Sequence, residues 1–386
     1  MDPGSNLGYP EDFVTQAPLI ESDGHLRSLL NKEFGIVYCT IRQLSGYDDL
    51  NFLLSECELG ESANALLKNS AGMSKRHKFV LKFSNPVEAR SSGLIEAQIK
   101  LMEALKKNGV PCAEVLPYVD GKFFKLVRVS GQVHLPMRLF TFVHGKMYDE
   151  FEHKHTNEAY SMIGRLLAKF HRVCDEKLEH DPQCQPFKLH CPFFSLENLS
   201  GIERELEMLC ESHSDLLSQT NDVIDPSEKI RVAQTAIFTF KKEILARKEI
   251  FLKGIIHSDF NEANLLFDTE NGKSHISALL DFGDTHYSLR IYDVANAILY
   301  IYLDFDLESK AQYSLHLSQL ERISFHLISS YLEELVPMSA ERTKFLGELK
   351  YIGICMRARL VLSSVCALRA FRINYRYIYI KLIWLR

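Results

Sequence analysis

Three polar residues in the second half of the chain have side chains and a spacing that could perform chemistry together. Asp259 and Asn264 lie five residues apart in H-S-D-F-N-E-A-N-L-L, and Asp281 follows in L-L-D-F-G-D. A free aspartate can accept the proton of an alcohol, whereas an asparagine and a second aspartate can hold a magnesium ion. This order of an aspartate, an asparagine and a second aspartate along the chain is typical of a phosphoryl-transfer centre. The alternative is a hairpin in which the same residues only form turns.

Two short apolar segments beside these residues indicate how they could be brought together. Residues 265–267 (L-L-F) and 276–280 (I-S-A-L-L) have the composition of short β-strands. We expect these strands to direct Asn264 and Asp281 toward one metal–phosphate cluster, while Asp259 faces the acceptor hydroxyl.

The whole chain has the length and composition of an intracellular enzyme. Its 386 residues suit two lobes, and its net charge of -5 argues against nucleic-acid binding. Nine cysteines without a C-x-x-C pair favour reduced thiols in the cytoplasm. The first residues resemble no signal peptide, and no run of about 18 uncharged apolar residues predicts a membrane span. We therefore expect a cytoplasmic protein; its oligomeric state is not indicated.

The N-terminal part contains a strand, a glycine turn and a second strand. The strand at 36–44 leads into S-G-Y-D-D, in which Ser45, Gly46 and Tyr47 could cover a nucleotide. Backbone amides approach phosphates most closely where side chains are small. Because this loop contains only one glycine, the alternative is an ordinary hairpin turn that does not contact a nucleotide.

A lysine on a strand is followed by a carboxylate on a helix. Lys82 lies in F-V-L-K-F (79–83), and Glu96 lies near the start of an apolar-striped helix at 94–105. In kinases a helix glutamate holds such a lysine over the α- and β-phosphates. We therefore predict a Lys82–Glu96 pair, with Glu103 as the rival partner. A lysine that extends outward to solvent is the alternative.

The remaining patterns predict an α+β, protein-kinase-like fold with two lobes. Residues 1–20 read as a disordered leader, 21–145 as a nucleotide-covering lobe of antiparallel sheet with one long helix, and 146–370 as a mainly helical catalytic and acceptor-binding lobe. Residues 371–386 form an atypical tail that could be an amphipathic strand, a membrane-surface segment or a non-native end, of which we favour the last. Helices are expected at 155–173, 201–218, 226–248, 290–302, 318–335 and 342–368.

Taken together, the sequence resembles the aminoglycoside phosphotransferase/choline kinase superfamily of small-molecule kinases over residues 25–368. The Y-D-D-L-N-F loop and the D-F-G-D-T-H-Y continuation point to the branch that phosphorylates 5-hydroxy-L-lysine with GTP in lysine breakdown. The resemblance rests on S-G-Y-D-D-L-N-F (45–52), F-V-L-K-F-S-N (79–85), L-I-E-A-Q (94–98), H-S-D-F-N-E-A-N-L-L (257–266), L-L-D-F-G-D (279–284) and Y-D-V-A (292–295).

The resemblance implies a role for each matching residue. Asp259 would be the catalytic base, Asn264 and Asp281 the magnesium ligands, and Lys82 the phosphate-binding lysine with Glu96 as its partner. The donor would be GTP or ATP, between which the sequence does not decide. One departure is the serine in H-S-D, where the family usually has glycine.

A cationic amino-acid acceptor would need carboxylates for its amine and a cation for its carboxylate. Asp284 and Asp49 are candidates for the first task, and Arg290 and Arg357 for the second. Other acceptors left open are choline, homoserine, a sugar or an aminoglycoside. A third possibility is a pseudokinase that only binds ligands, which the intact candidate residues argue against.

Overall fold

The computed structural model describes residues 20–373, with gaps at 21, 45, 47–48, 71–76, 86–90, 131–132, 213–224, 309–312 and 336–338. The chain forms two compact units. Unit 1 comprises Met1–Lys106 and Cys112–Val143, and unit 2 comprises Lys107–Pro111 and His144–Arg386. The expected leader, apart from its last residue, and the tail beyond residue 373 lie outside the described residues.

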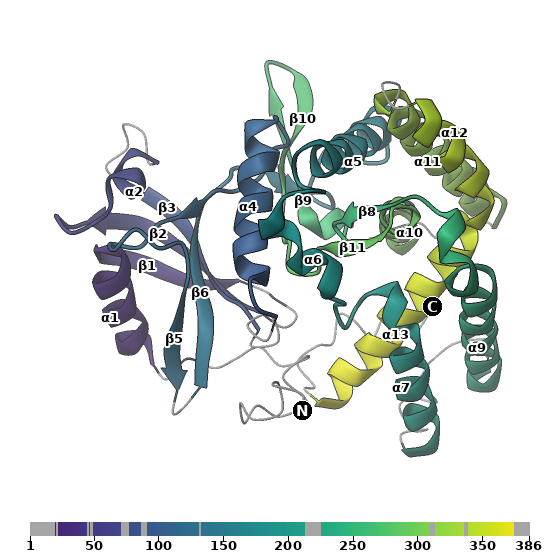
Figure 1. Ribbon diagram of the computed structural model, residues 1–386, viewed down its shortest axis with the longest axis horizontal. Helices are drawn as coiled ribbons and strands as arrows, with labels where there is room; N and C mark the ends of the chain where they lie inside the picture. The colour runs from purple at the N-terminus through teal and green to yellow at the C-terminus, as the bar shows by residue number, and fades with distance from the viewer. Residues whose placement is uncertain are drawn as a thin grey trace. The chain divides into compact units, whose positions relative to one another are not determined.

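Unit 1 is built on an antiparallel sheet in the order β1-β2-β3-β6-β4, with β5 also paired to β6 (Figure 1). Strand β2 shows why the sequence folds this way, because its buried residues largely alternate with partly exposed ones. Leu54, Leu81 and Leu139 from three neighbouring strands are fully buried in the core of the unit. The strands are β1 (Ile36–Leu44), β2 (Leu50–Leu59), β3 (His77–Phe83), β4 (Val115–Leu116), β5 (Lys125–Ser130) and β6 (Val133–Thr141).

In the described part of unit 1, three helices accompany this sheet: α1 (Asp23–Phe34), the short α2 (Ala65–Asn69) and α4 (Leu94–Lys107). Helix α1 begins at the cap Ser22, whose side chain accepts from His25 N, and ends at Gly35 in the left-handed conformation. The buried face of α4 is apolar except for Gln98, whose Oε1 accepts a hydrogen bond from Arg138 Nη1 at 2.6 Å. The sheet therefore meets a polar group of α4 through Arg138.

Unit 2 is mainly helical and contains two small antiparallel sheets, β10-β9-β7 and β11-β8. Helix α13 packs against α7, α9 and α10, and α5 packs against α11 (Figure 1). The helices are α5 (Asn157–Lys177), α6 (Pro186–Leu189), α7 (Leu199–Ser212), α9 (Pro226–Glu243), α10 (Ile291–Glu308), α11 (Tyr313–Glu334), α12 (Ser339–Glu348) and α13 (Ile352–Ile373). The strands are β7 (Lys146–Met147), β8 (Lys253–Ile256), β9 (Leu265–Glu270), β10 (Lys273–Leu279) and β11 (His286–Leu289).

The predicted helices are largely present, with shifted ends, but the one expected at 342–368 is two helices, α12 and α13, separated by a 3₁₀ turn at Leu349–Tyr351. Residues 213–218 of the helix expected at 201–218 lie outside the described residues. The helix expected at 226–248 ends at Glu243 and is followed by a 3₁₀ turn at Leu245–Ile250. The helix expected at 290–302 continues to Glu308. Helix ends depend on packing and capping that a periodic pattern does not contain.

One stretch, Ala340–Ala370, is long and apolar enough to cross a membrane, although no membrane span was expected. Within the structure 67% of its most apolar window is buried. Most of that stretch is α13, which packs against three other helices of unit 2. Its apolar composition is therefore explained by burial inside a folded unit.

Helices α5 and α11 approach each other closely at Gly164. A Cβ atom at this position would collide with the carbonyl oxygen of Leu327 and with Ser330 Oγ, both on α11. Only a glycine lets the two backbones come this near, so the distance between the helices depends on it.

We expect Gly164→Ala to destabilise the protein by about 1–3 kcal/mol, because the added methyl group must push backbone away. The measurement is the midpoint of thermal unfolding. Gly347→Ala on α12 is the matched control, since a Cβ there would meet nothing within 4 Å. Equal midpoints for the two variants would contradict the close approach.

Candidate active site

The segment that follows β8 is held by a buried carboxylate from α10. Asp293 Oδ2 accepts from His257 N at 2.8 Å, and its Oδ1 accepts from Ser258 N at 2.8 Å. His171 of α5 donates through Nε2 to Asp293 Oδ2 at 3.1 Å. Burial alone would raise the pKa of Asp293, but the hydrogen bonds from His171 and His257 hold that pKa below its ordinary value. Asp293 is therefore a buried anion that orients the loop.

Ser258 has a left-handed backbone, with φ at 71°. Glycine adopts this conformation easily, and a residue with a Cβ does so at a cost of roughly 1 kcal/mol. Both peptide groups beside it are fixed, because Asp293 accepts from Ser258 N, and Ser258 O accepts from Asn296 Nδ2 at 2.7 Å. The serine in H-S-D thus keeps a backbone geometry that usually selects glycine.

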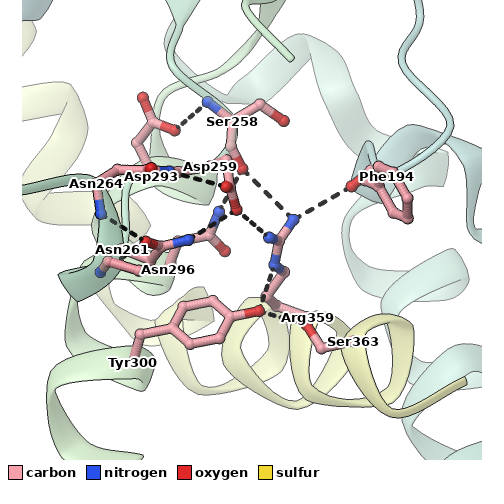
Figure 2. Close-up of polar contacts among 11 residues, drawn as sticks. Phe194, Ser258, Asp259, Asn261, Asn264, Asp293, Asn296, Tyr300, Arg359 and Ser363 are labelled. Carbon is pink, nitrogen blue, oxygen red and sulfur yellow. Dashed lines mark hydrogen bonds and ion pairs between the residues drawn. The ribbon is translucent and has the colours of Figure 1, made fainter. Parts of the chain in front are cut away.

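The carboxylate of Asp259 is held by three side chains (Figure 2). Its Oδ1 accepts from Arg359 Nη2 at 2.6 Å and from Asn261 Nδ2 at 2.9 Å. Its Oδ2 accepts from Asn264 Nδ2 at 2.9 Å. The side chain of Asp259 remains 29% exposed. It is therefore an oriented carboxylate that a solute can still reach.

Backbone pairing brings Asn264 and Asp281 close together. Strands β9 and β10 pair Leu265 with Leu279, and Leu280 N donates to Asn264 O at 2.9 Å. The amide nitrogen of Asn264 is used on Asp259, so its oxygen is directed elsewhere. An amide oxygen and a carboxylate are hard ligands of the kind that Mg²⁺ binds. The donor set of Asn264 and Asp281 thus fits a divalent cation.

In unit 1, Lys82 on β3 pairs with Asp49, which stands immediately before β2. Lys82 Nζ lies 2.5 Å from Asp49 Oδ2, and Asp49 Oδ1 accepts from Asn85 N at 2.7 Å. Both side chains are about nine-tenths buried. A Cβ at Gly46 would lie 2.5 Å from Asp49 O, so this loop needs a glycine. Ser45 and Tyr47 lie outside the described residues.

The expected pair of Lys82 with Glu96 needs correction. Glu96 lies on the exposed side of α4, as does its rival Glu103. The polar residue that α4 buries is Gln98, two positions after Glu96 and so on another face of the helix. The carboxylate beside Lys82 is that of Asp49, which we had expected near the acceptor.

The two arginines expected to bind an acceptor carboxylate are placed differently. Arg290 is buried in an ion pair with Asp175 and also donates to Glu341 at 3.2 Å. Arg357 is exposed on α13. The structure therefore gives Arg290 a role in packing unit 2 and leaves Arg357 at the surface.

The arginine that reaches Asp259 is Arg359, which the sequence patterns did not single out. Burial would lower the pKa of its guanidinium, but Tyr300, Asp259 and Asp284 hold that pKa above its ordinary value. Asp284, an expected acceptor residue, therefore lies near Arg359. The sequence does contain one signal for Arg359, which is a charged residue within a largely apolar helix. A charge that is buried with such a helix requires a polar partner.

The chain belongs to the family described as "Phosphotransferase enzyme family", whose pattern matches residues 45–323. A relative from Mus musculus named "Hydroxylysine kinase" is 24% identical over 291 residues, which cover 73% of this chain and 70% of that protein. The protein is thus a phosphotransferase that phosphorylates a hydroxyl group, with a nucleotide as donor. The resemblance predicted from the motifs is confirmed.

Solved structures confirm the predicted fold class. The amicoumacin kinase hAmiN, in complex with AMP-PNP, Ca2+ and Ami, matches with a TM-score of 0.61 at 14% identity, covering 94% of this chain and 93% of that one. An ethanolamine kinase from Plasmodium vivax matches with a TM-score of 0.51 at 14% identity, covering 90% of this chain and 81% of that one. At these identities the likeness concerns the fold alone.

We expect Asp49→Asn to lower kcat/KM for the nucleotide by roughly tenfold or more, because Lys82 loses the charge that holds its ammonium group. Steady-state kinetics at saturating acceptor measures the effect. Glu96→Gln is the control and should match the wild type. If Glu96→Gln is impaired and Asp49→Asn is not, the reassignment of the Lys82 partner is wrong.

Proposed function

We propose that this protein transfers the γ-phosphate of GTP or ATP, with Mg²⁺, to the hydroxyl of 5-hydroxy-L-lysine, as a step of lysine breakdown in the cytoplasm. The observation that carries the proposal is the similarity to a protein named hydroxylysine kinase over 73% of the chain. The arrangement around Asp259 supports it, since the carboxylate is oriented and partly exposed.

On the donor side, we propose that Lys82 binds the phosphates and that Asp49 holds its ammonium group in place. Gly46 would let the loop backbone approach the nucleotide. In unit 2, Asn264 and Asp281 would hold the magnesium ion. When bound there, the ion would supply positive charge that offsets the charge of the triphosphate.

On the acceptor side, we propose that Asp259 orients the hydroxyl and accepts its proton as the phosphoryl group is transferred. Little covalent help is needed for this reaction, so the placement of the hydroxyl decides the rate. Asn264 stabilises the orientation of the carboxylate through its hydrogen bond to Oδ2.

The acidic surroundings of the catalytic loop favour a cationic acceptor. Glu262 is partly buried near Asp304, Asp259 and Asp149, and desolvation together with these charges raises the pKa of its carboxyl to about 8. Its Oε2 has no hydrogen-bond partner among the residues that the structure describes. An ammonium group nearby would stabilise its charged form. Choline, an aminoglycoside or homoserine remain the alternative acceptors, and a binding protein without turnover is disfavoured by the ordered Asp259.

Asp259→Asn should preserve the fold and nucleotide binding but lower kcat by about 10²–10⁴-fold, because the amide cannot accept the hydroxyl proton. Nucleotide affinity is measured by calorimetry and turnover by a coupled assay. Asp281→Ala provides the contrast, since it should weaken Mg²⁺-dependent nucleotide binding itself. Wild-type turnover in Asp259→Asn would reject Asp259 as the base.

A comparison of four acceptors tests the substrate. We expect hydroxylysine to give the highest kcat/KM, because choline and homoserine each lack one of the two charge anchors, the carboxylate and the side-chain amine respectively. Lysine carries the same charges without the hydroxyl and should inhibit competitively without being phosphorylated. The values are measured with GTP and with ATP. A higher kcat/KM for choline or homoserine would sink the assignment of hydroxylysine and leave the kinase activity standing.

A further inference from the structure

We propose that Arg359 is a positioning residue for phosphoryl transfer, which fixes the carboxylate of Asp259 so that Oδ2 is the oxygen that takes the proton. The inference rests on the proposed role of Asp259 and applies to whichever hydroxyl is the acceptor. It concerns a contact between α13 and the catalytic loop, whose two residues lie 100 positions apart in the sequence.

The guanidinium of Arg359 is held from several directions (Figure 2). Its Nε donates to Tyr300 Oη at 3.0 Å, and its Nη1 donates to Phe194 O at 3.2 Å and to Ser258 O at 3.4 Å. Its Nη2 donates to Asp259 Oδ1 at 2.6 Å. Arg359 is only 5% exposed. A buried side chain with this many fixed contacts has one orientation available.

These contacts leave little capacity to bind the acceptor itself. A guanidinium has five N–H groups, and the four contacts above leave one of them. An anchor for a substrate carboxylate would ordinarily offer two parallel N–H groups. Arg359 is therefore built to hold Asp259 and the backbone at Ser258.

The same contacts distinguish the two oxygens of Asp259. Among the residues that the structure describes, Oδ1 accepts from both Arg359 and Asn261, whereas Oδ2 accepts from Asn264 alone. A carboxylate oxygen has two lone-pair sites, so Oδ1 is filled and Oδ2 has one site left. The geometry thus selects Oδ2 for the hydroxyl.

The family match does not account for this arginine. It ends at residue 323, whereas α13 begins at Ile352. The positioning of Asp259 by Arg359 is therefore read from this structure alone.

The test uses the full-length protein with the best acceptor found for the wild type. Arg359→Ala should lower kcat by roughly 100-fold, because a misoriented Asp259 carboxylate loses most of the rate acceleration that comes from correct placement beside the hydroxyl. The KM for the nucleotide should stay unchanged, and added methylguanidine should restore part of kcat by filling the vacated site. Arg357→Ala is the matched control, an exposed arginine on the same helix. Wild-type kcat in Arg359→Ala would overturn the proposal, as would a loss that methylguanidine does not relieve.

A second variant covers the case in which Arg359→Ala does not fold. Arg359→Lys keeps the positive charge, but a lysine lacks the planar guanidinium that donates hydrogen bonds to Asp259 and Tyr300 in one fixed geometry. It should lower kcat by roughly tenfold at an unchanged thermal midpoint. An unchanged kcat would overturn the proposal.

A double-mutant cycle separates this inference from the role of Asp259. If Arg359 acts through Asp259, Arg359→Ala should have almost no further effect on kcat in an Asp259→Asn background. Loss of activity in Asp259→Asn with full activity in Arg359→Ala would reject the inference alone. Full activity in Asp259→Asn would reject the catalytic base and the inference together.

Discussion

The segment that carries Asp259 depends on the buried carboxylate of Asp293. A charge inside a protein is costly unless hydrogen bonds satisfy it, and Asp293 receives them from the backbone of His257 and Ser258 and from His171. His171 is fixed in turn, because its Nδ1 accepts from Tyr331 Oη at 2.8 Å. Any shift of the loop would take the two backbone donors away from this buried charge. The left-handed conformation of Ser258 persists for the same reason.

Asp293 and Asp259 show how surroundings separate a buried structural carboxylate from an accessible one. Asp293 is fully buried, and the protein supplies its donors. Asp259 is partly exposed, and one of its oxygens retains capacity for another hydrogen bond. Both are ordered, but only Asp259 can meet a substrate. The difference lies in the donors around each group and not in the residue type.

The parts of the site set by local chain geometry could be predicted from the sequence, and the parts set by distant packing could not. Asn264 and Asp281 adjoin two strands that pair with each other, so short-range spacing already implied their proximity. The predicted pair of Lys82 with Glu96 did not take into account which face of the helix Glu96 occupies. Glu96 and Glu103 lie seven residues apart, on the same exposed face of α4. The contact of Arg359 spans 100 residues, so the charged residue in a largely apolar helix indicates that a partner exists, but the nearby sequence does not identify Asp259 as that partner.

Hydrophobic burial is what aims Arg359 at the catalytic loop. Its neighbours on α13, Cys355, Ala358 and Leu362, are buried, and helical spacing places Arg359 on the same face. The apolar composition that makes this stretch resemble a membrane span thus comes from packing inside unit 2. A buried arginine on such a face requires polar partners wherever the helix lies. Here Asp259 is one of them, so the packing of α13 and the orientation of the Asp259 carboxylate are physically coupled.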